Sequence, residues 1–217
     1  MTVITLTAAV VVIAAIAIAG EYRPTRTLVY VFKPLTTILI IALAVLAGQA
    51  EAAYQRLIVL GLVLSLAGDV FLMLPEKPRS YFLPGLVAFL LAQVSYIWAF
   101  SLGTPWAVRD VPILIPFAVF GVGCSVYFWP RLGPMKLPVV AYIVVILAMG
   151  WRSGVRLGVE DVTMTGGLCA LVGAVSFIVS DLILATNRFV QPFKAARLTN
   201  LTTYWGAQLL IALSLHF

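Results

Sequence analysis

Two aspartates lie inside apolar segments of this chain, where carboxyl groups are rare. Asp69 follows the apolar residues 57–68, and Asp181 follows the apolar residues 170–180. A carboxylate at membrane depth costs about 3 kcal/mol or more unless it is protonated, paired or hydrated. The chain has only eight acidic residues, so the presence of two of them in apolar segments indicates that these carboxyl groups have a function. A pair of carboxyl groups can divide general acid and general base chemistry between them.

The composition identifies a membrane protein. The chain is 63% hydrophobic and 10% charged, whereas an average soluble domain is about 25% charged. Eight segments approach the roughly 20 apolar residues that a helix needs to span a bilayer. They lie near residues 2–20, 28–48, 56–75, 81–101, 110–129, 135–151, 165–186 and 198–217. We therefore predict an all-α fold, a polytopic bundle of eight transmembrane helices, with residues 1–217 as a single transmembrane domain.

The distribution of Lys and Arg predicts the orientation of this bundle, because cytoplasmic loops carry an excess of both. Four basic residues lie in the loops after helices two, four and six, and ten lie at the other ends of the helices. The four are Arg56, Arg109, Arg152 and Arg156; the ten are Arg23, Arg26, Lys33, Lys77, Arg79, Arg131, Lys136, Arg188, Lys194 and Arg197. Both termini are then expected to lie outside the cytoplasm. The expected location of the protein is a bacterial inner (plasma) membrane. The net charge of +6 reflects topology, so the expected partners are membrane lipids and not nucleic acid.

The surroundings of the two aspartates resemble each other. Residues 62–72 align with residues 174–184, with a small residue before each Asp and an apolar run after it. The two aligned segments belong to predicted helices three and seven, which are four helices apart. A repeat of this length would correspond to two parallel four-helix halves, although apolar sequences also align by chance. Small residues lie on the same faces, which would turn both carboxyl groups into the bundle. The alternative is that each Asp only bonds a neighbouring helix.

Lys33-Pro34 is predicted to open the second helix, because Pro fits the first helical turn. Lys33 would then stand at the mouth of the helix, within reach of a carboxylate or a phosphate. Alternatively, its side chain extends to the lipid headgroups.

Two further helices carry polar side chains on one face. Asn200, Tyr204 and Gln208 are spaced by four residues and form a stripe that could line a wet cavity, and Gln93 and Tyr96 can share a face of helix four. Interhelical hydrogen bonding is the alternative for these residues. All five are candidate substrate-binding residues, together with Lys33.

The sequence contains no motif typical of a metal site or of a catalytic nucleophile. Cys124 and Cys169 lie in predicted helices without a CxxC motif, and His216 is the single histidine. The chain has no GxSxG, HExxH or Gly-rich phosphate loop. We expect no cofactor and no metal, and neither a serine esterase, a zinc enzyme nor a nucleotide-driven pump.

Five segments resemble the YhhN-like lysoplasmalogenase family of eight-helix membrane proteins, in consistent order from about residue 28 to the C-terminus. They are Lys33-Pro34-Leu35, Gly68-Asp69-Val70-Phe71-Leu72-Met73-Leu74, Gly85-Leu86-Val87-Ala88-Phe89-Leu90, Ser180-Asp181-Leu182-Ile183-Leu184-Ala185 and Tyr204-Trp205-Gly206-Ala207-Gln208-Leu209-Leu210. The resemblance implies hydrolysis of the vinyl ether bond of a lysophospholipid, the lysoplasmalogen. The products would be a fatty aldehyde and glycerophosphoethanolamine or glycerophosphocholine.

The resemblance also implies that Asp69 and Asp181 are the catalytic pair. Each lies six or seven residues before the predicted end of its helix, so we expect both to face one hollow that opens toward the cytoplasmic leaflet. Cleavage of a vinyl ether begins with protonation of carbon, and two carboxyl groups can divide the work as in glycosidases. We favour Asp181 as the acid, with Asp69 held ionised by Lys33, although either assignment is open. The family often carries His at the position of Gln93, and Gln cannot shuttle a proton.

Other functions fit parts of the same pattern. A proton-coupled transporter of a small molecule or lipid also uses intramembrane carboxyl groups and internal repeats. An intramembrane aspartyl protease would need GxGD, where this chain has Leu66-Ala67-Gly68-Asp69. A scaffold role is the remaining alternative, and the oligomeric state and physiological lipid stay open.

Overall fold

The computed structural model describes residues 3–23, 27–48, 50–74, 81–105 and 107–217. Arg26, Lys77 and Arg79, which contribute to the predicted charge asymmetry, lie outside these residues. The described chain forms helices and no strand. The long helices are α1 (Val3–Gly20), α2 (Thr27–Val45), α3 (Ala52–Met73), α4 (Phe82–Ser101), α5 (Val111–Phe128), α6 (Lys136–Arg156), α7 (Met164–Phe189) and α8 (Ala196–Leu213). Short 3-10 turns flank α5 and precede α6.

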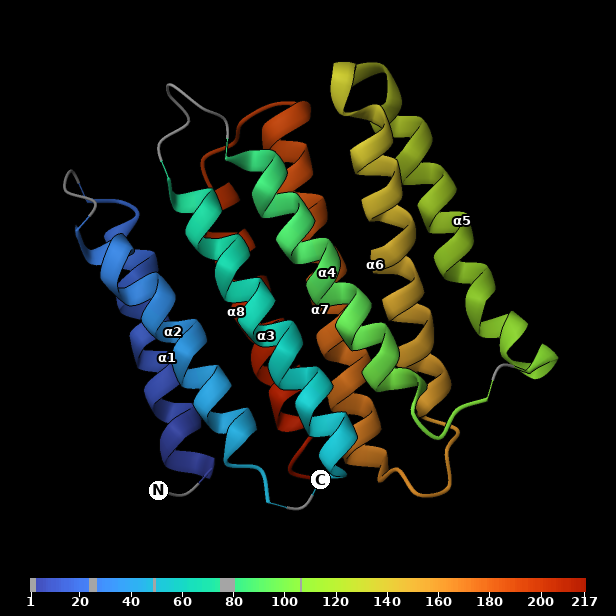
Figure 1. Ribbon diagram of the computed structural model, residues 1–217. Coiled ribbons are helices and arrows are strands. Elements are labelled where there is room, and N and C mark those ends of the chain that lie inside the picture. Colours follow the sequence, from blue (N-terminus) through green and yellow to red (C-terminus); the bar gives the residue numbers. More distant parts are fainter. Residues whose placement is uncertain (1–2, 24–26, 49, 75–80, 106) are drawn as a thin grey trace.

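The helices run up and down in sequence order, so the labelled N and C ends lie at the same end of the bundle (Figure 1). The pair α1 and α2 forms one side, and α5 forms the opposite edge, where it packs mainly on α6. The closest pairs are α3 with α4 and α7 with α8. These two pairs carry both aspartates and five of the other six candidate site residues.

Seven helices, α1 to α7, are long and apolar enough to cross a membrane, counting the 3-10 turns with α5 and α6. The prediction of eight spanning helices is thus confirmed for seven. The eighth helix, α8, has 18 residues but is not among them. Its polar side chains, which include Arg197, Asn200, Thr203 and Gln208, reduce its hydropathy.

Glycines set how closely the central helices approach. A Cβ on Gly61 of α3 would lie 2.2 Å from Cε1 of Tyr96, and one on Gly173 of α7 would lie 3.0 Å from the carbonyl oxygen of Ala207 on α8. Small residues therefore allow α3 to pack on α4 and α7 on α8. The prediction that the carboxyl groups point into the bundle is confirmed for Asp69, which is only 2% exposed. Asp181 is half-buried.

Candidate active site

Asp69 is held by side chains from two other helices. Thr37 of α2 donates a hydrogen bond to Oδ2 at 3.0 Å, and the hydroxyl of Tyr204 of α8 donates to the same oxygen at 2.8 Å. Nζ of Lys33 lies 3.6 Å from Oδ1, and both side chains are largely buried. Lys33 thus compensates the buried carboxylate, as pairing of buried charges requires.

A hydrogen-bonded chain extends from Asp69 into the bundle. Tyr204 accepts a hydrogen bond from Nε2 of Gln208 at 3.4 Å, and Oε1 of Gln208 accepts from the hydroxyl of Tyr96 at 2.7 Å. All three side chains are buried. This network, from Lys33 to Tyr96, is called the Asp69 network below.

Asp181 has different partners. The hydroxyl of Tyr142 of α6 donates to Oδ2 of Asp181, and Nε2 of Gln93 of α4 donates to the same oxygen at 3.4 Å. Gln93 also donates to the hydroxyl of Tyr142 at 2.6 Å. Oε1 of Gln93 is buried, and no hydrogen-bond partner for it lies in the described part of the chain. These three residues form the Asp181 network.

Aromatic rings pack beside both networks, and Phe89 also lines a cavity together with Tyr142 and Asp181. Phe89 packs edge-on against Phe177 and against Tyr204, with ring centroids 6.2 and 5.8 Å apart. It also packs on Gly68, beside Asp69, where an added Cβ would lie 2.6 Å from the ring. No hydrogen bond or ion pair among the described residues joins the two aspartates.

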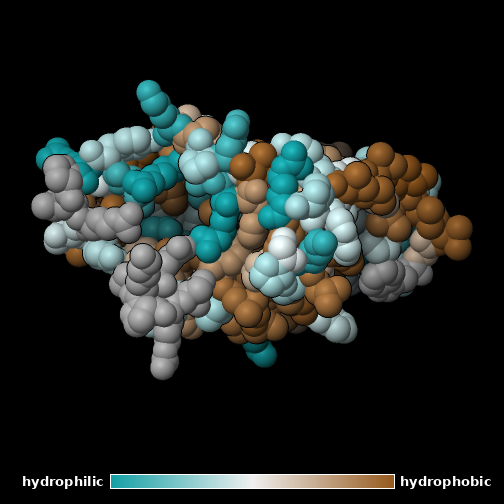
Figure 2. Space-filling view, turned by 90° about the horizontal axis from the view of Figure 1, so that it is seen from above, coloured by the Kyte–Doolittle hydropathy of each residue, from teal (hydrophilic) through white to brown (hydrophobic). Residues whose placement is uncertain are grey.

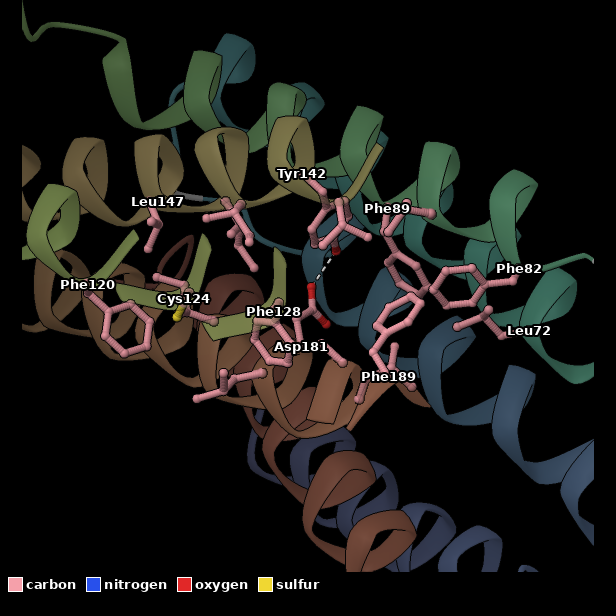
Figure 3. Close-up of a pocket in the computed structure, with 18 residues that line it drawn as sticks. Leu72, Phe82, Phe89, Phe120, Cys124, Phe128, Tyr142, Leu147, Asp181 and Phe189 are labelled. Atoms are coloured by element: carbon pink, nitrogen blue, oxygen red, sulfur yellow. Dashed lines mark hydrogen bonds between the residues drawn. The ribbon is translucent and has the colours of Figure 1, made fainter. Parts of the chain in front are cut away.

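Asp181 lines an apolar slot of about 70 Å³ between α4, α5, α6 and α7 (Figure 3). Its carboxyl group points at Tyr142, and Phe82, Phe89 and Phe189 form the wall at one end of the slot. Asp69 does not line this slot.

A second, polar cavity of about 460 Å³ lies at the end of the bundle where α3 and α7 end. Seen from that end, hydrophilic residues surround a hollow over the α1, α2 and α8 side, and hydrophobic residues cover the α5 side (Figure 2). Lys33, Arg188 and Asn200 line it, and neither aspartate does. The polar cavity and the apolar slot share Leu72, Phe82 and Leu184 as walls.

Three sequence expectations need correction. The aspartates do not line a common cavity of these two, because Asp181 lines the apolar slot and Asp69 lines neither the slot nor the polar cavity. Lys33-Pro34 does not open α2, which begins at Thr27 and contains Pro34. The polar stripe of α8 is not a continuous cavity lining, since Asn200 reaches the polar cavity while Tyr204 and Gln208 are buried in hydrogen bonds.

The remaining candidates divide between the networks. Gln93 joins Asp181, whereas Tyr96, one turn away on α4, belongs to the Asp69 network. Asn200 donates to the carbonyl oxygen and the hydroxyl of Ser180, next to Asp181. Tyr142 of α6 was not predicted from the sequence, although a lone phenol in an otherwise apolar segment is a signal that could have identified it.

No group of three or more His, Cys, Asp or Glu side chains that could hold a metal occurs among the residues that the structure describes.

Comparison with known proteins gives a family and several relatives. The profile of the YhhN family matches residues 28–215. The human protein named lysoplasmalogenase TMEM86A is 38% identical over 72% of this chain, and human lysoplasmalogenase TMEM86B is 34% identical over 76%. These matches span 64% and 65% of the human chains, which is less than two thirds of their length. An uncharacterized membrane protein YhhN of Escherichia coli O157:H7 is 28% identical over 93% of both chains. No solved structure matches the chain.

Proposed function

Because the chain belongs to the YhhN family, and relatives over most of its length are named lysoplasmalogenases, we propose that it hydrolyses the vinyl ether bond of lysoplasmalogens. The products are a fatty aldehyde and glycerophosphoethanolamine or glycerophosphocholine. The observation that carries this proposal is the carboxyl group of Asp181, placed in an apolar slot and bonded by Tyr142 and Gln93.

The slot suits the start of an alkenyl chain. Its volume of about 70 Å³ accommodates roughly five water-sized groups, so only the first carbons of the chain fit inside. The rest of the chain leaves between α5 and α7 toward the lipid, because α5 packs mainly on α6. The vinyl ether then lies beside Asp181.

A single carboxyl group can carry out the reaction in three steps. Protonated Asp181 transfers its proton to the second carbon of the alkenyl chain, which leaves an oxocarbenium ion at the first carbon. Water adds to the first carbon and gives a proton to the Asp181 carboxylate. The hemiacetal then collapses: its hydroxyl proton is lost, the bond to the glycerol oxygen breaks, and that oxygen receives a proton. The sum is addition of one water molecule.

Tyr142 and Gln93 position this acid. Both donate to Oδ2, so Oδ1 is assigned as the oxygen that carries the transferable proton. The buried Oε1 of Gln93, which lacks a protein partner among the described residues, is suited to accept a hydrogen bond from the attacking water. Gln93 needs no proton-shuttle role in this arrangement.

Asp69 takes a positioning role in place of the second catalytic carboxylate that the sequence suggested. Its contacts are Thr37, Tyr204 and Lys33, and it lines neither cavity. It fixes the ammonium group of Lys33 at the polar cavity and ties α2 and α8 to α3. Its loss then acts on folding and substrate binding more than on the chemical step.

The proposed topology has eight spans, with α8 crossing the membrane inside the bundle. The supporting observation is that both termini lie at one end (Figure 1), which requires an even number of crossings. The proposed orientation has the polar cavity at the cytoplasmic leaflet of a bacterial inner membrane, and the excess of Lys and Arg at this end of the helices supports it. A duplication into two four-helix halves remains part of this proposal.

Mass spectrometry of lipid products tests the proposed reaction. Purified protein is incubated with lyso-vinyl-ether, lyso-acyl and lyso-alkyl phospholipids that share one headgroup. Aldehyde release from the vinyl ether alone is expected. In D₂O, with immediate reduction of the product, the aldehyde is expected to carry one deuterium on its second carbon, because protonation occurs there. Cleavage of the acyl lipid alone, or product without that deuterium, would overturn the mechanism.

A further inference from the structure

We propose that Phe82, at the boundary between the apolar slot and the polar cavity, restricts the site to lipids with a free hydroxyl group on the second glycerol carbon. The inference rests on the proposed function, because it names the residue that excludes a second chain from the same substrate. It predicts that a group added to this hydroxyl weakens binding, and that a larger group weakens it more.

Three side chains form the boundary between the two spaces. Leu72 of α3, Phe82 of α4 and Leu184 of α7 line both the slot and the polar cavity. The slot has a volume of about 70 Å³ and the polar cavity one of about 460 Å³, so the passage leads from a wide space into a narrow one. A lipid with its chain in the slot and its polar part in the cavity crosses this boundary.

Phe82 is held in place by two contacts of its ring. The ring of Phe189 packs edge-on against it, with ring centroids 5.7 Å apart, and the guanidinium carbon of Arg188 lies 4.1 Å from the Phe82 centroid. Both kinds of contact favour one orientation of the ring, and Phe82 is only 9% exposed. Phe82, Phe189 and Leu72 lie together at one end of the slot (Figure 3).

Leu72 is held against the helix that carries Phe82. A Cβ on Gly85, which lies one turn after Phe82 on α4, would be 3.0 Å from Cδ2 of Leu72. The absence of a side chain at Gly85 therefore lets Leu72 pack directly on α4. Because protein interiors are densely packed, a wall held in this way resists the addition of even one methylene group.

The spacing along α7 places the second glycerol carbon at this boundary. Leu184 follows Asp181 by three residues, which correspond to about 4.5 Å along the helix axis. In the proposed reaction the first alkenyl carbon lies beside Asp181. Three bonds separate it from the second glycerol carbon, and at about 1.5 Å each they reach at most about 4.5 Å. The substituent on this carbon therefore lies level with Leu184, opposite Phe82.

Binding of saturated ether lipids tests this selection without requiring turnover. The probes are 1-hexadecyl-glycerophosphocholine, which is the lysolipid, and its 2-methyl ether, 2-acetyl ester and 2-butanoyl ester. The 2-deoxy analogue removes the hydroxyl group without adding volume. Affinities are measured in detergent for the wild-type chain, F82A, F82L and F193A. F193A is the matched control, because Phe193 is an exposed phenylalanine outside the lining of both cavities.

The wild-type chain and F193A should bind the 2-acetyl lipid at least about tenfold more weakly than the lysolipid, because insertion of extra groups into a packed wall is costly. The 2-methyl ether should lose less and the 2-butanoyl ester more. F82A should reduce the acetyl penalty to less than about threefold, because the space left by the ring accepts the added group, and F82L should be intermediate. The 2-deoxy analogue should bind as tightly as the lysolipid.

Each penalty is a ratio of two affinities in one preparation, so a smaller folded fraction of F82A does not change it. Equal affinities of the wild-type chain for the lysolipid and the 2-acetyl lipid would overturn the role of Phe82, as would an undiminished acetyl penalty in F82A. A 2-deoxy lipid that binds as weakly as the 2-acetyl lipid would show recognition of the hydroxyl group instead of exclusion by size.

The corresponding vinyl ethers separate this inference from the proposed reaction. Absence of aldehyde release from every lipid, together with an acetyl penalty that F82A relieves, overturns the proposed function alone. Aldehyde release from the lysolipid, together with an acetyl penalty that F82A leaves unchanged, overturns the role of Phe82 alone. If both proposals hold, F82A should also release aldehyde from the 2-acetyl vinyl ether faster than the wild-type chain does, relative to the lysolipid.

Discussion

Replacing each aspartate by asparagine separates the single-acid mechanism from a two-carboxylate mechanism. In D181N the side chain keeps its shape and its oxygen can still accept from Tyr142, but it has no proton to transfer. A positioned general acid contributes about 10²- to 10⁴-fold to rate, so we expect kcat to fall about 10³-fold. Stability should change by less than about 1 kcal/mol, because the hydrogen bonds are retained.

D69N should have the opposite signature. It removes the carboxylate that accepts from Thr37 and Tyr204 and compensates Lys33. Breaking one side of a buried ion pair costs about 3 to 5 kcal/mol, which corresponds to a melting temperature lower by about 10 °C in a chain of this size. KM should rise because Lys33 loses its position, while kcat stays within about tenfold of the wild-type value.

The assays are thermal unfolding in detergent and aldehyde release over a range of lipid concentrations. The double variant K33M/D69N provides the control, because removing both members of a buried pair is nearly neutral for stability. It should recover most of the lost melting temperature without recovering KM. A D69N protein with wild-type stability, wild-type KM and a kcat as low as that of D181N would refute the assignment and restore Asp69 as a second reacting group.

Three other substitutions test separate parts of the structure. Y142F removes the hydroxyl that donates to Asp181, so kcat should fall about tenfold to a hundredfold with KM unchanged, as measured by aldehyde release. G61A places a Cβ 2.2 Å from the ring of Tyr96, and thermal unfolding should show a loss of about 1 to 3 kcal/mol. D110N removes a carboxylate 3.8 Å from the buried Arg152; it should cost about 3 kcal/mol and leave kcat unaltered, because this pair lies at the opposite end of the bundle.

The sequence was sufficient to identify the two carboxyl groups and to suggest Lys33 as a partner of Asp69, but not to identify the partners of Asp181. Burial of Asp69 and its pairing with Lys33 follow from the cost of an isolated charge in an apolar segment, and the structure confirms the pair at 3.6 Å. Tyr142 could not be assigned to Asp181, because no local spacing connects residues on α6 and α7. That contact depends on how each helix is rotated about its own axis, which packing of the whole bundle decides.

Gln93 and Tyr96 show the same limit within one helix. Residues three apart on a helix differ by about 60° in direction, so both were assigned to one face. In the structure α4 packs against α3 and α6, and those 60° direct Tyr96 toward Gln208 and Gln93 toward Tyr142. The same angular sensitivity directs Phe89 onto Gly68 and Tyr204 and into the wall of the slot that Asp181 lines.

Access to the site from one end distinguishes a hydrolase from a transporter. A carrier must open its binding site alternately to both sides of the membrane. At the end of the bundle opposite the polar cavity, buried Arg152 of α6 donates to Ser101 at 2.9 Å and to the carbonyl oxygen of Thr104 at 2.6 Å. Trp151 donates to the carbonyl oxygen of Asp110 at 3.0 Å.

These hydrogen bonds tie the end of α4, the turn before α5 and α6 together, so opening a second exit would require breaking a buried, charged network. A hydrolase needs no such exit, because its water-soluble product leaves through the polar cavity and its aldehyde enters the lipid. Protein reconstituted in liposomes should therefore show no lipid-dependent proton flux. A flux that persists in D181N while aldehyde release is lost would show that transport, and not hydrolysis, is what the buried carboxyl groups serve.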